Sequence, residues 1–207
     1  MLVKEYSVRK IVNLIIHKIY TILTCRSARV IRYPLVLSGG KYIKWGKRLT
    51  MGRGCRLDVI RRVGQAPPVL KFGYEVQLND YVHICALDRV EIGDFTLIAS
   101  HVYISDNSHG CYKGLSHDSS PMTKPLERPY PTSPVIIGEK VWIGEGVIVM
   151  PGVSIGNGCV IGAHSIVNTN VPDNCIAAGA PAKVIKRYNF ESNKWERTNP
   201  DGTFFEK

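Results

Sequence analysis

Long hydrophobic runs and acidic residues are both scarce in this 207-residue sequence. The apolar stretches near the start are short and interrupted by Lys, His and Asn, so we expect no membrane-spanning helix. No small-residue cleavage site follows a clean apolar stretch, so we expect no signal peptide.

Lys and Arg number 27 against 17 Asp and Glu, giving a net charge of +10. This excess predicts anionic partners, such as the phosphates of a cofactor or a membrane surface. No nucleic-acid-binding motif accompanies the charge, so we expect no nucleic acid partner.

Cysteine pairs with the spacing of a zinc site are also missing. The cysteines are scattered and never form CxxC: Cys25, Cys55, Cys85, Cys111, Cys159 and Cys175. We interpret them as reduced thiols in a cytoplasmic protein, and we predict neither a disulfide framework nor a metal site.

The helical period occurs in one place, residues 4–24, where apolar residues recur every three or four positions. The set is Val8, Ile11, Val12, Ile15, Ile16, Ile19, Ile22 and Leu23. We assign residues 1–34 to an N-terminal amphipathic helical cap. One interpretation is a helix that packs on the end of a solenoid as a cap. A capping helix would show one apolar stripe, just as a membrane-bound helix would. The other is a basic helix that lies on the inner face of an anionic cytoplasmic membrane.

A strict period of six residues governs the stretch from Ile137 to Pro172. Every sixth residue is aliphatic: Ile137, Ile143, Val149, Ile155, Ile161 and Val167. This period fits neither a long helix nor a long strand. It is typical of a chain that turns a corner every six residues and completes a coil in three.

The same period begins at Phe72 and continues through Leu78, Ile84, Ile92, Ile98 and Ile104, with two extra residues at Val90–Glu91. The two stretches make twelve hexapeptides, or four coils, and residues 42–60 suggest a degraded first coil. Arg61–Pro68 reads as a loop. The predicted fold is therefore mainly β, a parallel β-helix that we place over residues 35–187. Residues 188–207 form a short terminal cap or a loose tail.

The period stops for residues 110–136, which are rich in Gly, Pro, Ser and Tyr. We call this segment the excursion loop. It follows one complete coil and precedes another, so it leaves the stack intact, and loops of this length usually serve a function. His109 comes just before it, and Trp142 lies six residues into the next coil. We expect both side chains to point outward near the base of the loop, where His109 would be a suitable general base.

These features resemble the left-handed β-helix acyltransferases, the hexapeptide-repeat transferase superfamily. The resemblance rests on ISDNSHGCY (104–112), VWIGEGVIVMPGVSIG (141–156) and AAGAPAKVI (177–185). It is strongest for the branch that O-acetylates bacterial surface polysaccharides (capsule, O-antigen or exopolysaccharide), a relative of the maltose and galactoside acetyltransferases. It implies an acetyl-CoA-dependent O-acetyltransferase that acts directly on a sugar hydroxyl, without an acyl-enzyme or a metal.

The resemblance also implies roles for individual residues. His109 matches the catalytic base, and Trp142 matches an aromatic residue beside the acyl-CoA channel. Other positions match the channel lining or the residues that hold the CoA phosphates: Gly144, Glu145, Ala163, Asn168, Lys183 and Lys186. Glu145 replaces a small hydroxyl residue and Asn168 replaces Thr, so the cofactor contacts differ locally. Asn79 and Tyr81 are equal candidates for acceptor contacts. Members of the family are homotrimers with the active site between subunits.

Other functions remain open alternatives. An acetyltransferase of this fold can act on an antibiotic, serine or a nucleotide-linked amino sugar instead. A metal-dependent carbonic anhydrase needs three converging imidazoles. His83 and His101 do not converge, because the two extra residues align His83 with Tyr103. A non-enzymatic, membrane-associated scaffold would leave the CoA-like features unexplained.

Overall fold

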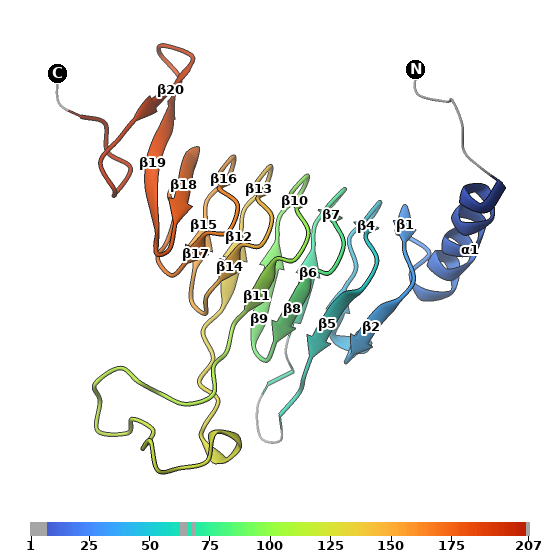
Figure 1. Cartoon of the computed structure of the whole chain (residues 1–207), viewed down its shortest axis with the longest axis horizontal. Helices are drawn as coiled ribbons and strands as arrows, with labels where there is room; N and C mark the ends of the chain where they lie inside the picture. Colours follow the sequence, from blue (N-terminus) through green and yellow to red (C-terminus); the bar gives the residue numbers. More distant parts are fainter. Residues whose placement is uncertain (1–7, 63–65, 68, 206–207) are drawn as a thin grey trace.

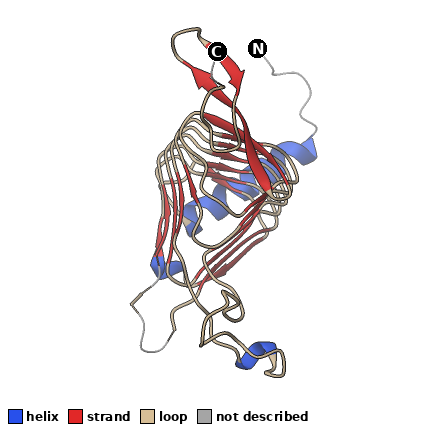
Figure 2. Ribbon diagram, turned by 90° about the vertical axis from the view of Figure 1, so that its left-hand side faces the viewer, coloured by secondary structure: helices blue, strands red, loops and turns tan. Residues whose placement is uncertain are grey.

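The computed structural model describes residues 8–62, 66–67 and 69–205, which form a left-handed parallel β-helix (Figure 1). The predicted fold is confirmed. Short strands stack into three sheets that make the sides of a triangular prism (Figure 2). Each coil contributes one strand to each sheet in turn.

The described residues place the strands in three sheets, which we call A, B and C. Sheet A has nine strands: β1 (Val30–Ile31), β4 (Thr50–Met51), β7 (Gln77–Leu78), β10 (Leu97–Ile98), β13 (Trp142–Ile143), β16 (Val160–Ile161), β18 (Cys175–Gly179), β19 (Ala182–Asn189) and β20 (Lys194–Arg197). Sheet B has six: β2 (Leu35–Ser38), β5 (Cys55–Val59), β8 (His83–Ala86), β11 (Tyr103–Ser105), β14 (Ile148–Val149) and β17 (Ile166–Val167). Sheet C has five: β3 (Ile43–Lys44), β6 (Val69–Phe72), β9 (Arg89–Ile92), β12 (Val135–Ile137) and β15 (Ser154–Ile155).

The core is a set of aliphatic columns that run along the axis of the prism. In sheet B, Leu57 pairs with Ile84, Ile84 with Ile104, and Ile104 with Val149, so equivalent residues lie directly above one another. All four side chains are fully buried. The aliphatic residues predicted at six-residue intervals all point inward, and Cys159 joins them as expected. Such columns stabilise the stack because each coil buries the apolar edge of the one before.

The regular coils extend beyond both ends of the predicted repeat. β1 already pairs in parallel with β4, so the first coil begins at Val30 rather than after residue 34. Residues 42–60 do form a coil, as expected, and it is regular, since β3, β4 and β5 all pair in register with the next one. Its sequence pattern is weak, and β3 and β4 have only two residues each. At the other end β19 crosses residue 187 and forms an antiparallel hairpin with β20.

The N-terminal helix α1 (Val8–Thr24) lies across the open end of the prism (Figure 1). Residues 4–7 of the predicted helix lie outside the described residues, as do 63–65 and 68 of the predicted loop and 206–207 of the tail. None of the helices in the described residues is long and apolar enough to cross a membrane.

A polar face of α1, rather than its apolar stripe, contacts the first coil. Thr21 Oγ1 accepts a hydrogen bond from the Ile31 N–H at 2.7 Å, and His17 Nδ1 accepts one from the Tyr33 N–H at 3.2 Å. The two side chains thereby satisfy backbone groups at the exposed edge of the solenoid, which would otherwise be open to pairing with another chain. Burial, and next the charges of Arg53 and Arg32, lower the pKa of His17, so neutral imidazole is favoured there.

The helix therefore does pack on the end of the solenoid, as one interpretation held, but its apolar stripe is exposed and does not make the contact. Its side chains are about half exposed or more: Ile11, Val12, Leu14, Ile15, Ile16, Ile19, Ile22 and Leu23. The buried and half-buried residues Asn13, His17, Tyr20, Thr21 and Thr24 follow the same helical spacing on the opposite side. The helix is amphipathic, but it is turned with its apolar side away from the prism.

Asp106 fixes the corner from which the excursion loop leaves. The side chain is fully buried, and its carboxylate accepts hydrogen bonds from the backbone N–H groups of Leu87, Asp88 and Arg89 at 2.8–3.1 Å. Asn107 Nδ2 donates to the same carboxylate at 3.0 Å. Leu87–Arg89 is the widened turn that accommodates the two extra residues of this coil. One carboxylate therefore joins two successive coils just before His109.

We expect Asp106→Asn to lower the free energy of unfolding by about 1–3 kcal/mol, because an amide nitrogen would then face backbone donors. Urea unfolding measures the change. The control is Asp88→Asn in the same turn, where the side chain is exposed and the substitution leaves the contacted backbone N–H in place. Equal unfolding midpoints for the two variants would contradict this role.

Candidate active site

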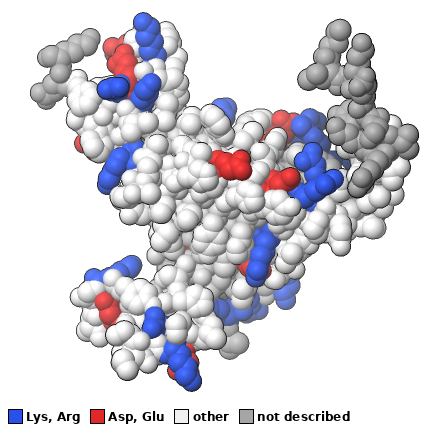
Figure 3. Space-filling model, viewed as in Figure 1, with Lys and Arg blue, Asp and Glu red and all other residues white. Residues whose placement is uncertain are grey.

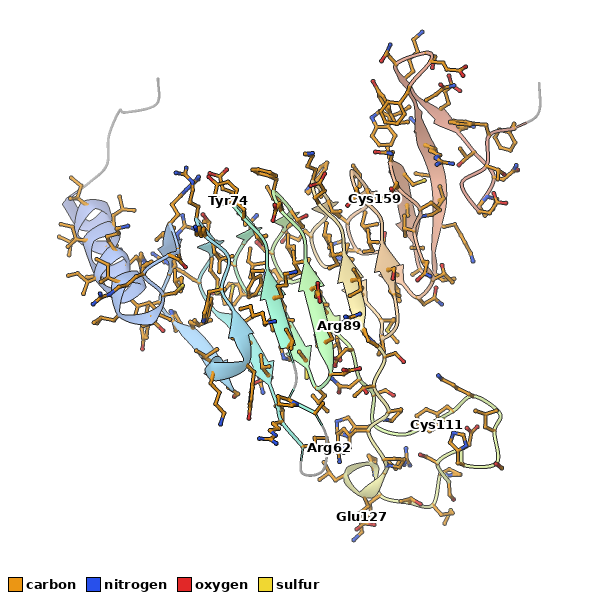
Figure 4. The ribbon with its side chains drawn as sticks, turned by 180° about the vertical axis from the view of Figure 1, so that it is seen from behind. Arg62, Tyr74, Arg89, Cys111, Glu127 and Cys159 are labelled. Atoms are coloured by element: carbon orange, nitrogen blue, oxygen red, sulfur yellow. The ribbon has the colours of Figure 1, made fainter. Side chains whose placement is uncertain are left out.

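His109 lies in a cavity of about 390 Å³ at the base of the excursion loop. Ile60, Arg62, Cys85, Leu87, Asn107, His109 and Tyr130 line it. The lining comes from the ends of two sheet B strands, β5 and β8, and from both stems of the loop. Figure 4 shows Arg62 between the coils and the loop. The His109 side chain is exposed, so a ligand can reach its ring.

The two stems of the excursion loop pair with each other and hold His109 in place. The Gly110 N–H donates to Pro129 O at 2.8 Å, and the Ser133 N–H donates to Asp106 O at 2.7 Å. The Tyr112 hydroxyl donates to the backbone carbonyl of His109 at 2.6 Å. The imidazole lies against the Tyr130 ring, with the two centroids 4.3 Å apart. The return stem thus supplies an aromatic wall for the histidine.

Asn107 and Cys85 form the polar part of the cavity. Asn107 Nδ2 donates to Asp106 Oδ1 at 3.0 Å and to Cys85 Sγ at 3.4 Å. Burial raises the pKa of the Cys85 thiol, so the thiolate that nucleophilic catalysis requires is disfavoured. Burial raises the pKa of Cys55 and of Cys159 to about 11. His109 is therefore the residue of the cavity best suited to accept a proton at neutral pH.

A charged cluster on the outer face of sheet B adjoins this cavity. The Asp58 carboxylate is almost fully buried; it lies 2.6 Å from Arg56 Nε and 3.1 Å from His83 Nε2. Burial raises the pKa of Asp58, but the hydrogen bonds from Arg56 and His83 outweigh this effect, and the pKa lies below its usual value. His83 also pairs with Tyr103, as the sequence predicts. The negative charge of Asp58 is therefore already neutralised by its neighbours.

Trp142 does not lie near the base of the excursion loop, and this part of the expectation is wrong. The loop returns into sheet C at β12, and Trp142 begins the following side of the prism, in sheet A. A single hexapeptide makes one side of the triangle, so six residues carry the chain around a corner. The Trp142 side chain does point outward and is 54% exposed.

Trp142 shares an outward column with a basic residue near the C-terminal end. In sheet A, Trp142 pairs with Val160, Val160 with Ile176, and Ile176 with Lys186. Lys186 in turn pairs with Arg197 of the C-terminal hairpin. With about 4.8 Å between neighbouring strands, Lys186 lies about 14 Å from Trp142 along this face. The column joins an exposed aromatic ring to two cations.

Lys186 and Arg197 line a second cavity, of about 380 Å³, together with Val184, Ile185, Thr198 and Phe205. Two cations and an aromatic ring suit the phosphates and the base of a nucleotide. Its lining comes mainly from the β19–β20 hairpin. Figure 2 shows this hairpin and the excursion loop on opposite sides of the prism. Lys183 is exposed on the same strand as Lys186.

The other predicted residues occupy two corners of the prism. Gly144 and Glu145 follow β13, and Ala163 takes the equivalent corner one coil later. A Cβ atom on Gly144 would lie 2.7 Å from the Ala163 backbone nitrogen, so only glycine permits this stacking. Asn168 follows β17 of sheet B and is exposed.

The candidate acceptor residues do not line the His109 cavity. Asn79 and Tyr81 lie in the turn before β8, whereas the cavity contains residues from the end of that strand. Tyr81 stacks on His101, with ring centroids 5.1 Å apart. Within the described residues, no three His, Cys, Asp or Glu side chains are close enough to hold a metal ion.

Sequence reasoning did not identify Arg62, Tyr130, Asp58 or Arg197. Tyr130 lies in a segment without a period, and Arg62 lies in a predicted loop, so no pattern relates either of them to His109. Asp58 could have been noticed as a carboxylate two residues after Arg56, which places both charges on the same face of a strand. Arg197 has no such signal, because its position depends on the terminal hairpin.

Comparison with known proteins identifies hexapeptide-repeat transferases as relatives of this chain. The family described as bacterial transferase hexapeptide (six repeats) matches residues 134–169. A putative lipopolysaccharide biosynthesis O-acetyl transferase, WbbJ of Escherichia coli K12, is 42% identical over 196 residues, which cover 95% of this chain and 97% of WbbJ.

Two solved structures share the fold. A galactoside acetyltransferase in complex with coenzyme A superposes with a TM-score of 0.54 at 28% identity, covering 87% of this chain and 70% of the other. A mutant of AntD, an N-acyltransferase from Bacillus cereus in complex with dTDP and coenzyme A, gives 0.64 at 22% identity, covering 79% and 82%. The latter identity supports the fold alone. With its repeats, its buried columns and this near full-length relative, the chain belongs to the hexapeptide-repeat transferase family.

Proposed function

We propose that the protein is an acetyl-CoA-dependent O-acetyltransferase that acetylates a sugar hydroxyl during the assembly of a bacterial surface polysaccharide. The relative WbbJ is named a putative lipopolysaccharide biosynthesis O-acetyl transferase and aligns over nearly its whole length. The observation that carries the proposal is His109, an exposed imidazole in a cavity large enough for a small ligand. Such sites span about 300–1,000 Å³.

In this proposal His109 removes the proton from the acceptor hydroxyl as the oxygen attacks the acetyl carbonyl. Acetyl-CoA supplies an activated thioester. When its carbon–sulfur bond breaks, the CoA thiolate leaves and takes up the proton that His109 removed from the hydroxyl. The Tyr130 ring and the Tyr112 hydroxyl hold the base in position. A hydroxyl is barely ionised at pH 7, so a positioned base contributes about 10²–10⁴-fold to the rate.

The proposed donor site is the outward column of sheet A. The cavity of Lys186 and Arg197 suits the phosphates and adenine of CoA, and Trp142 stands further along the same face, toward the N-terminal end. The distance of about 14 Å between Trp142 and Lys186 along this column suits an extended pantetheine arm that crosses three strand spacings. Two relatives of known structure were solved with coenzyme A bound.

Within one chain, the proposed donor site and His109 lie on different parts of the prism. His109 lies at the junction of sheets B and C, whereas Trp142 and Lys186 are on sheet A. A ring of three copies would bring sheet A of one copy against the His109 cavity of the next, and a C3 ring closes on itself. We infer that the protein acts as a homotrimer whose sites lie between subunits.

The exposed stripe of α1 supports a peripheral membrane contact. From Tyr6 to Leu57 the sequence has no Asp or Glu, although Lys and Arg recur throughout. Figure 3 shows basic side chains on the coils toward the same end. An apolar helix face beside a basic surface is the arrangement that binds anionic lipid. We infer that α1 lies on the cytoplasmic membrane, where polysaccharide precursors are assembled.

We expect His109→Ala to reduce kcat for acetyl transfer by about 10²–10⁴-fold, because the acceptor hydroxyl would lose its base. Release of free CoA thiol with the deacetylated polysaccharide as acceptor measures the rate, and mass spectrometry identifies the ester. His117→Ala is the matched control, since His117 is exposed on the excursion loop outside the cavity. Transfer by His109→Ala at the control rate would remove His109 from this role.

We expect Ile15→Asn with Ile19→Asn to abolish sedimentation with vesicles that contain phosphatidylglycerol. Both side chains are exposed, so their loss removes apolar contact with lipid without removing contacts to the coil. Leu126→Asn is the control, because Leu126 is also apolar and even more exposed but lies on the excursion loop. Equal sedimentation of all three proteins would exclude α1 as the contact.

A further inference from the structure

Arg62 stands at the edge of the His109 cavity, and no residue in the described part of the chain is an acidic partner for it. Its guanidinium carbon lies 4.3 Å from the centroid of the Tyr130 ring, and His109 packs against the same ring. Tyr130 thus links the cation to the proposed base. Arg62 is half-buried, whereas the adjacent Arg61 is exposed and does not line the cavity.

The neighbouring carboxylates are all engaged elsewhere. Asp58 is bound by Arg56 and His83, and Asp106 by backbone N–H groups. Among the described residues Arg62 makes no ion pair, although Arg29, Arg48, Arg56 and Arg89 each have a carboxylate within 4 Å. None of the described residues that line the cavity is acidic. The cavity therefore has a positive charge that the protein leaves uncompensated.

An unpaired guanidinium at the edge of this cavity is suited to binding an anion. Its planar donors match the oxygens of a phosphate or a carboxylate, and stacking on an aromatic ring limits its motion before binding. Binding then costs little side-chain entropy. An uncharged sugar would gain much less from such a residue, because it offers no charge to pair with.

We propose that Arg62 binds an anionic group on the acceptor, so that the enzyme selects a charged sugar substrate. The group is either the carboxylate of an acidic sugar or the diphosphate that links a sugar to its carrier. Both provide the oxyanion that the guanidinium recognises. The assignment of this anion to the acceptor rests on the proposed function, whereas the anion site itself does not.

Footprinting of His109 tests the site without any acetyl transfer. Diethyl pyrocarbonate modifies exposed histidines, and mass spectrometry of the His109 peptide gives the rate at each concentration of added ligand. The probes are inorganic pyrophosphate, glucuronate and uncharged glucose. We expect at least one anion to slow modification of His109, with glucose far less effective. Protection by pyrophosphate alone indicates a diphosphate-linked acceptor, and protection by glucuronate alone indicates an acidic sugar.

Substitutions then assign the protection to Arg62. We expect Arg62→Gln to weaken the binding of the protecting anion by about 10- to 100-fold, the usual effect of losing one charge-assisted hydrogen bond. Arg61→Gln and Lys186→Gln should retain protection, the second because the proposed donor phosphates bind elsewhere. Arg62→Lys keeps the charge without the planar donors and should give an intermediate value. Unchanged thermal unfolding shows that each variant is folded.

Two results would overturn the proposal: no protection of the wild-type protein by either anion, or equal protection of the wild-type protein and Arg62→Gln. The link to the acceptor is tested separately, by steady-state kinetics with charged and uncharged acceptors. There Arg62→Gln should raise KM for the charged acceptor and leave KM for acetyl-CoA unchanged. Protection of a protein that acetylates no sugar would uphold the anion site and reject the proposed function.

Discussion

Hydrogen bonding between successive coils is the constraint on which the rest of this structure depends. Each short strand pairs its backbone with the strands above and below, so equivalent positions of successive coils lie directly above one another. Inward positions become aliphatic columns such as Leu57, Ile84 and Ile104. Outward positions become columns too, and these give the molecule its binding surfaces. The fold and the candidate sites thus arise from one register.

The register also separates the two candidate sites. The sheet A column carries Trp142 toward Lys186 and Arg197, while the excursion loop leaves the far side of the prism beside His109. A solenoid cannot bend to bring two of its own sides together, since each coil is fixed by its neighbours. On the proposed assignment of His109 and the sheet A column to one active site, a complete site for two substrates would need a second copy. The ends are adapted differently, with polar side chains of α1 closing the first coil and a hairpin closing the last.

The sequence predicts the parts of the molecule that repeat. The positions of Ile137, Ile143 and their equivalents identify the fold and the core, and the break in the period locates His109. What does not repeat could not be predicted. The contact between Tyr130 and His109 depends on how the two loop stems pair, and the orientation of α1 depends on unpaired backbone groups that its apolar pattern does not reveal. The repeat makes Trp142 only the sixth residue of the coil that begins where the loop returns at Ile137, but those six residues turn a corner of the prism and carry Trp142 onto sheet A.

Complementation between inactive subunits tests most directly whether the active site is shared between copies. One variant is His109→Ala, and the other is Trp142→Ala combined with Lys186→Ala, so each lacks one proposed half of the site. Co-produced at equal amounts, random trimers with sites between subunits should recover about a quarter of wild-type acetyl transfer, since one site in four combines two intact halves. Activity no higher than the mean of the two separate variants would show that the halves do not meet between copies and would contradict the account.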